Sequence, residues 1–390
     1  MSSDDGTPVN FLYTNIGRGH PYYLDGIIEC MLPGRIGSVS DVFDATSGLA
    51  RQTWKLARFI YHSAGRSRLF SAPYNRLRAR GEFNRRGLMQ DIMGRPLRKL
   101  FVEDPTPLVV AHPMLVAILK DKPGLFYQHG EIAAPRESWV RGRHRTLVPL
   151  SHTADTLLEV GFVPENLFIS GLCIEPALVA QADDALNARL DRLEGSGPLC
   201  GAFFSSGAEP REHVETLATA ALSAVAAGGR VLLFARRSGL LAARVSARFV
   251  EQKRDLEIVQ SPGDLPARAP QALMCLYDGR RQLNDFTEKL FASFDYFIAP
   301  SHERTNWALG LGLPMFVVDP PLGSFSPLNR EFLLARSVAR AVGGRQEACH
   351  FAETLGNLQR TGELRAMAEA CWRRFDTRGF FNIGEMLRSL

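Results

Sequence analysis

The start of the sequence carries a histidine in a glycine-rich turn, between an apolar run and a helical pattern. The turn reads Gly17-Arg18-Gly19-His20, and Pro21 follows in a position typical of the first turn of a helix. Such a turn presents backbone N–H groups at the positive end of the helix. Gly17, Gly19 and His20 therefore predict an anion or ligand site. A tight turn with a surface histidine and no ligand would have the same sequence pattern.

Histidine titrates near neutral pH, so His20 could act as a general base or orient a substrate. At a helix start it could equally be a cap or a phosphate contact. His129 is a second candidate base, because Gln128-His129-Gly130 follows another apolar run. Glu131 could orient the His129 imidazole. A loop histidine bonded to its own neighbours would explain His129 equally well.

Small and polar residues also follow apolar runs in the second half of the sequence. Ser205-Ser206-Gly207 forms a turn that could hold phosphates. Arg236 follows the next run, where it could neutralise a diphosphate or remain a solvated charge. Further candidates for ligand hydrogen bonds gather at a predicted helix start: Ser301, His302, Glu303, Thr305 and Asn306. Helix capping would explain Ser301 and Thr305 equally well.

Apolar runs that alternate with helical patterns predict two tandem, doubly wound α/β units that position these residues. Strands are expected at 9–14, 36–43, 107–113, 124–130, 146–149, 166–171, 199–204, 230–234, 256–259, 272–277, 296–299 and 315–318. A polar stretch at 176–198 separates a Rossmann-like domain over 1–178 from a second one over 198–369. Ligands bind at the carboxyl ends of parallel strands, so we expect the substrate in a cleft that the two domains face.

The composition indicates a protein without a membrane span. The 390 residues are 45% hydrophobic, which suits two cores, and the sequence has no apolar run of the roughly 20 residues that cross a bilayer. The first six residues are polar and acidic, unlike a secretory signal, so we expect a cytoplasmic protein. The six scattered cysteines indicate neither zinc nor disulfides and are expected to be buried packing residues.

The basic charge is concentrated in one segment. Residues 51–99 hold thirteen Lys or Arg against two acidic residues, whereas the whole chain has a net charge of +5. A basic helix face is formed by Arg51, Lys55, Arg58 and His62, and an apolar face beside it by Trp54, Ala57, Ile60 and Tyr61. Such a helix can lie on an anionic membrane, here the inner face of the plasma membrane, or pack on its own domain with a solvated cationic face. No nucleic-acid-binding motif accompanies the charge, so nucleic acid is not an expected partner.

Several segments, in order, resemble the GT-B glycosyltransferases, in particular the branch with the peptidoglycan lipid-precursor transferase and the diacylglycerol sugar transferases. The resemblance covers nearly the whole chain. The longest match lies in 154–176, where GFVPEN and ISGLCIEP follow the family's "Gly-Val-Pro-x-x-Lys-Ile-x-Val-Thr-Gly-Ile-Pro-Val-x-Pro" stretch. The shorter matches are the Gly-x-Gly-His turn at 17–20 and the segments 125–139, 203–207, 294–301 and 305–314.

The resemblance implies that the first domain binds the acceptor and the second binds the nucleotide sugar, without a metal or a further cofactor. It also implies that residues 370–390 form closing helices that cross back to the first domain. The turn with His20 would face the acceptor and the donor pyrophosphate, and Asn329 would start a helix near the donor sugar.

Three residues depart from the family pattern near the donor. Trp307 stands where the family has a glutamate that holds the ribose, and Phe325 and Ser326 replace a glutamine and an acid. Asn306 or Glu303 could supply the ribose contact instead. Because of these departures, the sequence makes a UDP-sugar the leading candidate for the donor but does not identify the donor.

The sequence therefore predicts a metal-independent glycosyltransferase that moves a sugar from a nucleotide sugar to a hydroxyl acceptor that is lipid-linked or membrane-associated. A transferase of CDP- or CMP-linked polyol phosphates or acidic sugars is the alternative that fits the His129 segment. A non-catalytic lipid- or partner-binding protein with the same fold is a third hypothesis. Sugar-nucleotide epimerases share the architecture, but their acidic catalytic residues are not evident in the sequence.

Overall fold

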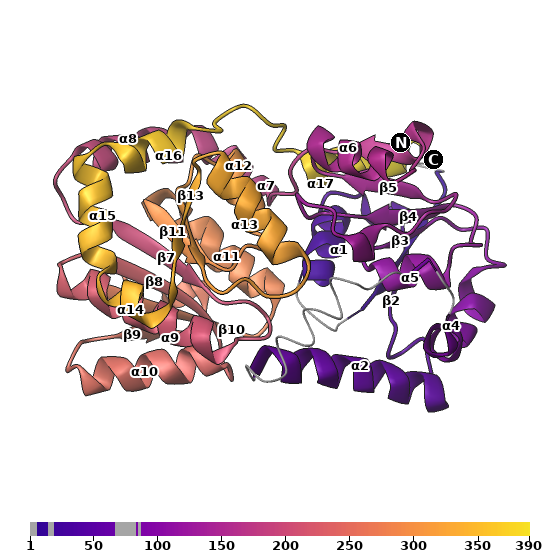
Figure 1. The fold of residues 1–390 in the computed structure, drawn as a ribbon, viewed down its shortest axis with the longest axis horizontal. Coiled ribbons are helices and arrows are strands. Elements are labelled where there is room, and N and C mark those ends of the chain that lie inside the picture. Colours follow the sequence, from indigo (N-terminus) through magenta and orange to yellow (C-terminus); the bar gives the residue numbers. More distant parts are fainter. Residues whose placement is uncertain (1–5, 15–18, 67–82, 85–86) are drawn as a thin grey trace. The chain divides into compact units, whose positions relative to one another are not determined.

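The computed structural model describes residues 6–14, 19–66, 83–84 and 87–390, without the side chains of 19–20 and 61–66. The chain divides into two compact units (Figure 1). Unit 1 comprises Met1–Pro176, Gly323–Leu328 and Asp376–Leu390. Unit 2 comprises Ala177–Leu322 and Asn329–Phe375. The chain therefore passes from one unit to the other four times.

Unit 1 is built on a six-stranded parallel sheet with the strand order β2-β1-β3-β4-β5-β6. The strands are β1 (Val9–Tyr13), β2 (Ile36–Asp41), β3 (Leu108–Val110), β4 (Leu125–Gln128), β5 (Arg145–Val148) and β6 (Leu167–Ile169). The helices are α1 (Gly19–Glu29), α2 (Gly48–Arg66), α4 (Leu88–Phe101), α5 (Pro113–Ile118), α6 (Ser151–Glu159) and α17 (Gly379–Arg388).

Strand β1 is buried at all five positions, as a central parallel strand covered on both faces must be. Val9 and Phe11 belong to an apolar cluster with residues of α1 and α17, whereas Leu12 belongs to a cluster with residues of α2, α4 and α5. The alternation follows the two-residue period of a strand. Two apolar layers therefore hold this sheet.

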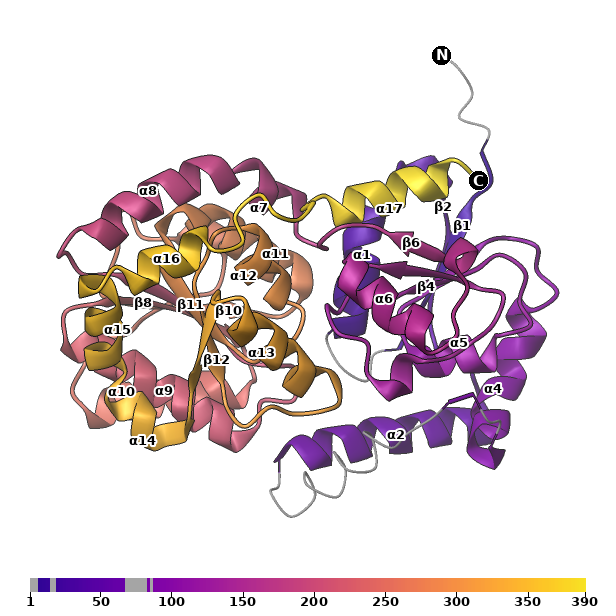
Figure 2. The same ribbon diagram turned by 45° about the horizontal axis from the view of Figure 1, so that its top comes forward.

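Helix α17 lies beside α1 in unit 1, although the two are far apart in the sequence (Figures 1 and 2). The approach is close because Gly26 has no side chain, and a Cβ there would lie 2.3 Å from the Phe380 ring. The Phe380 ring also contacts Tyr22, with 5.7 Å between ring centroids. The last elements of the chain thus complete the core of the unit that contains the first.

Helix α2 carries the predicted basic face, but its apolar side chains divide between core and surface. Trp54 is fully buried and its indole N–H donates to the Met93 carbonyl of α4, at 3.4 Å. Ile60, on the predicted apolar face, is 45% exposed and does not pack into the core. The side chains of Tyr61 and His62 lie outside the described residues. Among the described residues, α2 packs on its domain through the side that carries Trp54, and other apolar residues of the helix are exposed.

The exposed face of α2 combines apolar and cationic side chains. Leu56 and Phe59 are 52% and 67% exposed, and Arg51, Lys55 and Arg58 are exposed on the same helix. The Arg58 guanidinium also stacks over the Phe43 ring at 4.5 Å. Among the described helices, none is long and apolar enough to cross a membrane.

Unit 2 contains a seven-stranded parallel sheet with the order β13-β12-β11-β7-β8-β10-β9. The strands are β7 (Cys200–Phe204), β8 (Arg230–Arg236), β9 (Glu257–Val259), β10 (Ala272–Tyr277), β11 (Tyr296–Ala299), β12 (Met315–Val318) and β13 (Ala339–Val342). The helices are α7 (Pro176–Ala180), α8 (Ala182–Glu194), α9 (Arg211–Ala226), α10 (Leu240–Glu251), α11 (Arg280–Leu290), α12 (Thr305–Gly310), α13 (Phe325–Ala335), α14 (Gly344–Cys349), α15 (Phe351–Arg360) and α16 (Glu363–Glu369). The division places the first residues of α13 in unit 1.

The structure adds elements to those that the sequence predicts. Strand β13 was not expected, because Ala339-Arg340-Ala341-Val342 lacks a continuous apolar run. The stretch at 176–198 is mostly helical and belongs to unit 2, apart from Pro176. Of the six cysteines, four are buried, Cys30 is half-buried, and Cys349 is exposed, so the expected burial is wrong for Cys349.

Candidate functional site

The sheet of unit 2 changes winding direction between β7 and β11. From β7 the chain continues to β8 on one side, and it later returns to place β11 on the other side. Connections on the two sides of such a switch point diverge and leave a crevice at the carboxyl ends of the strands, where ligands bind in open α/β sheets. The residues that follow Phe204 of β7 and Ala299 of β11 are therefore the first candidates for a binding site.

Four buried polar atoms next to this switch point have no hydrogen-bond partner among the described residues. They are Ser205 Oγ after β7, and Arg304 Nε, Thr305 Oγ1 and Asn306 Oδ1 after β11. Thr305 and Asn306 are 0% exposed, and Ser205 and Arg304 are 6% and 7% exposed. Buried polar groups are almost always paired, so a cluster of unpaired ones indicates a polar ligand or water.

The Arg304 guanidinium is held by aromatic rings and by a carboxylate. It lies over the Phe204 ring at 4.2 Å and over the Trp307 ring at 5.3 Å. Its Nη1 donates to Glu303 Oε1 at 3.0 Å. These contacts fix a cation beside the end of β7, where it can bind an anionic group.

Trp307 belongs to the core of unit 2 and cannot bind a ribose as the glutamate of the resembling family does. Trp307 is 1% exposed. Its ring packs edge-on against Phe204, with 5.6 Å between ring centroids, and at a tilt against Phe297, with 6.0 Å between ring centroids. Asn306, the predicted substitute, donates through Nδ2 to the Glu303 carbonyl at 3.0 Å and keeps Oδ1 unpaired. The unpaired atom of Asn306 can only accept, which suits a hydroxyl or N–H of a ligand.

The other predicted residues of unit 2 lie around the same edge. Ser206 and Gly207 are half-buried in the turn after β7, and Arg236 is exposed at the end of β8. Glu209, in that turn, accepts a hydrogen bond from the Leu240 amide at the start of α10. The turn after β7 is thereby tied to the turn after β8. The Glu209 carboxylate also occupies the start of α10, so a phosphate would have to bind elsewhere on this edge.

Loops at the edge are cross-linked by polar side chains. Asn329 is fully buried and donates through Nδ2 to the Ser301 carbonyl at 3.1 Å. Arg330 forms two bonds with Asp319, at 2.8 and 2.9 Å. His213 donates through Nε2 to the Pro320 carbonyl at 2.7 Å, and burial lowers its pKa to about 4. These contacts hold the loops after β11 and β12 in place.

The structure describes two further predicted candidates in this loop. Burial lowers the pKa of His302, which keeps its imidazole neutral at neutral pH. Thr305 does not cap α12, because the capping position is Arg304 and no side-chain bond is made there. The Thr305 hydroxyl thus remains available to a ligand.

Unit 1 has its own switch point between β1 and β3, since β2 and β3 lie on opposite sides of β1. Thr14 follows β1 there, and its Oγ1 is buried without a partner among the described residues. Gly17 and the side chain of His20 lie outside the described residues. The backbone of Gly19 and His20 starts α1, as the sequence predicts. The His20 backbone therefore lies in the first turn after the switch-point strand.

Both ring nitrogens of His129 are already bonded. Nε2 lies 3.0 Å from the Ala133 carbonyl, which only accepts, so this nitrogen carries the proton. Tyr127 then donates its hydroxyl to Nδ1 at 3.2 Å. The ring is 2% exposed and also contacts Phe325 of α13, with 5.8 Å between centroids. His129 would have to give up one of these bonds to act as a base, which favours a structural role.

Acidic, histidine and cysteine side chains do not gather into a metal-binding group of three or more anywhere in the described part of the chain. Sequence reasoning overlooked Arg304 and Thr14, although both lie close in the sequence to residues that it selected. Arg304 lies between Glu303 and Thr305, and Thr14 ends the predicted first strand. Their position after parallel strands was the signal that could have found them.

No protein-family model and no curated protein matches the sequence. Solved structures do match. The UDP-GlcNAc 2-epimerase from Neisseria meningitidis, bound to UDP-GlcNAc, has a TM-score of 0.54 at 11% identity over 98% of this chain and 99% of that chain. Phytolacca americana UGT2, complexed with UDP-2fluoro-glucose and pterostilbene, has a TM-score of 0.52 at 13% identity over 99% and 95% of the two chains. The S. aureus MnaA–UDP co-structure has a TM-score of 0.54 at 11% identity over 96% and 94%.

The fold is GT-B. The two GT-B units are Rossmann-like, which confirms the predicted fold class. At this level of identity, the likeness establishes the fold alone.

Proposed function

We propose that the chain is a GT-B glycosyltransferase that moves a sugar from a nucleotide sugar, preferably a UDP-sugar, to a hydroxyl acceptor. The observation that carries this proposal is the cluster of four buried, unpaired polar atoms at the switch point of unit 2. Such a cluster suits a ligand with both a charged and a hydroxylated part. A nucleoside diphosphate has both.

The four atoms differ in what they can bind. Arg304 and the hydroxyls of Ser205 and Thr305 can donate to diphosphate oxygens, and Arg304 adds a charge that stabilises the departing diphosphate. Asn306 Oδ1 accepts, which fits a ribose hydroxyl or a base N–H. Together they could hold the leaving group without a metal, as the family resemblance implies.

Unit 1 would bind the acceptor, with His20 as the base that takes the hydroxyl proton or as the residue that orients this hydroxyl. This role rests on the position of His20 in the first turn of α1, directly after the switch-point strand β1. The resemblance to the lipid-precursor and diacylglycerol sugar transferases suggests an acceptor that is lipid-linked. The nucleotide sugar is then a substrate, and no further cofactor is needed.

Calorimetric titration with UDP, dTDP, GDP, CDP and CMP, without added metal, tests the donor site. We expect selective binding of UDP and, in Arg304→Met, an affinity about 10- to 100-fold lower, because a charged hydrogen bond to a buried anion is lost. Arg254→Gln, which removes an exposed arginine of unit 2, is the matched control. Selective binding of CDP or CMP would favour the polyol-phosphate or acidic-sugar transferase. A folded protein that binds none of the five would support the non-catalytic hypothesis.

UDP-GlcNAc 2-epimerases are among the structural neighbours, so epimerisation is a second candidate activity. Epimerisation at a sugar carbon needs groups that remove and return a proton. Three carboxylates at the unit 2 edge are already bonded: Glu303 to Arg304, Asp319 to Arg330, and Glu209 to the Leu240 amide. This favours transfer over epimerisation. Incubation with UDP-GlcNAc should therefore give no epimer, and accumulation of one would replace the transferase proposal.

The exposed face of α2 is proposed to hold the protein on an anionic membrane. Replacing Arg51, Lys55 and Arg58 together with glutamate should lower binding to phosphatidylglycerol vesicles by about 100-fold or more, since each basic residue near such a surface contributes roughly 1 kcal/mol. Co-sedimentation measures the effect. The matched control replaces Lys253, Arg254 and Arg268, three exposed residues of unit 2, with glutamate. Equal loss in both triple variants, or no loss in the first, would contradict a specific role for α2.

A further inference from the structure

The last residue of β4 has a buried side chain with one unpaired end. Gln128 is 1% exposed, and its Nε2 donates to Cys173 Sγ at 3.3 Å. Its Oε1 is buried and has no hydrogen-bond partner among the described residues. Burial raises the pKa of Cys173 to about 12, so the sulfur is an uncharged thiol. A buried amide oxygen without a donor is costly, so it indicates a ligand or water beside it.

Gln128 lies next to the start of α1. Phe126, two residues before Gln128, belongs to an apolar cluster with Tyr23 of α1, and the two-residue period of a strand puts Gln128 on the same face of the sheet. The Tyr23 ring also covers Gly130, where a Cβ would lie 2.1 Å from the ring. The end of β4 and the first turn of α1, which contains His20, are therefore neighbours in unit 1.

The charged groups around this edge of unit 1 are acidic. The Tyr22 hydroxyl donates to Glu175 Oε2 at 3.0 Å and lies 3.2 Å from the carbonyl of Cys173, the partner of Gln128. The described residues that directly follow the six strands include several carboxylates but neither lysine nor arginine, over 14, 42–45, 111–112, 128–131, 149–152 and 170–175. Arg18 lies outside the described residues. Carboxylates disfavour an anionic group, so this edge favours an uncharged ligand.

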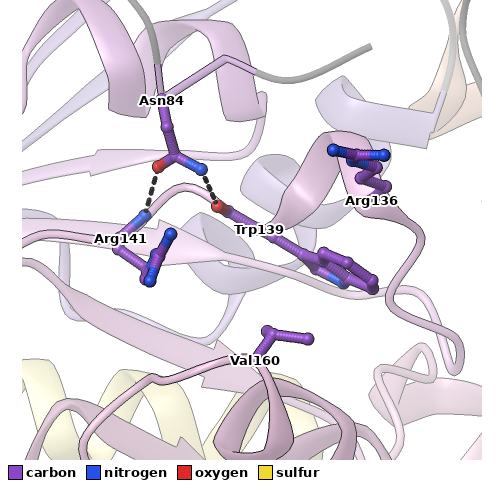
Figure 3. Close-up of a pocket in the computed structure, with 5 residues that line it drawn as sticks. All are labelled: Asn84, Arg136, Trp139, Arg141 and Val160. Atoms are coloured by element: carbon purple, nitrogen blue, oxygen red, sulfur yellow. Dashed lines mark hydrogen bonds between the residues drawn. The ribbon is translucent and has the colours of Figure 1, made fainter. Parts of the chain in front are cut away.

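Two arginines of the connection between β4 and β5 line a different pocket. That pocket is formed by Asn84, Arg136, Trp139, Arg141 and Val160 (Figure 3). Asn84 fixes its wall, because Nδ2 donates to the Trp139 carbonyl at 2.7 Å and Oδ1 accepts from the Arg141 amide at 2.9 Å. Gln128 is not among the residues that line this pocket. A ligand on Gln128 would therefore occupy a separate site.

We propose that Gln128 binds an uncharged hydroxyl of the acceptor, and that the acceptor headgroup is an uncharged polyol or sugar with at least two hydroxyls. His20 would take the proton of the reacting hydroxyl, and Gln128 Oε1 would accept a hydrogen bond from another hydroxyl, since one proton cannot serve both. This inference rests on the proposed function, because it gives the class of acceptor that unit 1 would take.

The experiment compares two pairs of probes by calorimetry on the full chain, with and without UDP, below their critical micelle concentrations. The pairs are octyl β-D-glucoside with octyl β-D-glucuronide, and 1-octanoyl-sn-glycerol with 1-octanoyl-sn-glycerol 3-phosphate. Only the second member of each pair is anionic. We expect at least one uncharged probe to bind saturably, about tenfold or more tightly than its anionic counterpart, because the site offers an acceptor beside carboxylates.

The outcomes separate this inference from the proposed function. A protein that binds UDP but none of the four probes would overturn the inference and leave the transferase proposal standing. Anionic probes that bind as tightly as the uncharged ones, or more tightly, would also overturn it. A protein that binds the uncharged probes but no nucleotide would keep the Gln128 site and contradict the transferase. This comparison needs no variant.

Variants test the residue itself. Gln128→Met should weaken the uncharged probe about 3- to 10-fold, the usual effect of one neutral hydrogen bond, with UDP affinity within about twofold. Cys173→Ala removes the partner of Nε2 but leaves Oε1, so it should bind the probe as the unaltered protein does. Gln252→Met, at an exposed glutamine of unit 2, is the matched control. Unchanged affinity in Gln128→Met, or an equal loss in Cys173→Ala, would show that Gln128 does not bind the probe.

Discussion

Replacing His20 with alanine is expected to lower kcat by about 10²- to 10⁴-fold, which is the usual contribution of a positioned general base. The dissociation constant of the nucleotide should stay within about twofold, because the proposed nucleotide contacts come from unit 2 and the proton transfer occurs only during the reaction. Steady-state kinetics with a fixed acceptor, together with calorimetry of UDP, separates the two effects.

His350→Ala is the matched control for His20. His350 is in unit 2, 67% of its side chain is exposed, and its only described ion contact is with Glu353 at 3.3 Å. This variant should keep the kcat of the unaltered protein. A His20→Ala protein that retained more than a third of the kcat would remove His20 from the mechanism and leave His129 as the next residue to test.

Replacing Arg189 with methionine is expected to lower the free energy of unfolding of unit 2 by about 3–9 kcal/mol, since each of three buried carbonyls left without a donor costs about 1–3 kcal/mol. Arg189 is fully buried in α8. Its Nε donates to the Phe294 carbonyl at 2.8 Å, and its Nη1 donates to the Leu311 and Gly312 carbonyls at 3.1 and 2.8 Å. Methionine keeps an apolar stem but bonds none of the three.

Urea unfolding followed by circular dichroism measures the loss in Arg189→Met, with Arg254→Gln as the exposed arginine control. Leu311 and Gly312 directly follow α12, the helix that carries Thr305 and Asn306. Nucleotide affinity should therefore fall as well under conditions where the variant is still folded. An unfolding free energy within 1 kcal/mol of the unaltered protein would show that neighbouring groups or water replace the three bonds.

The sequence predicted the elements with strong local signals. Buried parallel strands are nearly continuous apolar runs, so β1, β7 and β10 could be identified directly. Strand β13 has an exposed arginine between two alanines, and it forms because β12 pairs with it through the backbone. That pairing depends on tertiary structure, which a local pattern does not contain.

The sequence predicted where the residues of the candidate site lie in the chain, but not which groups they bond to or pack against. Thr305 and Asn306 were selected because they stand at a predicted helix start, and the structure adds that both are buried and that Thr305 Oγ1 and Asn306 Oδ1 have no partner among the described residues. The bonds of His129 to Tyr127 and Ala133 could not be predicted, because they depend on how the loop after β4 folds back. Likewise, only packing against Phe204 and Phe297 shows that Trp307 is a core residue.

The repeated crossing of the chain between the two units has a consequence for biosynthesis. Phe380 and Leu387 lie in the core cluster of unit 1 with Phe11 and Ile27, yet they are synthesised after all of unit 2. A ribosome therefore releases the complete sequence of unit 2 before it releases the helix that closes unit 1. Folding during synthesis should finish the later unit first, and the earlier unit would expose apolar surface to chaperones until α17 emerges.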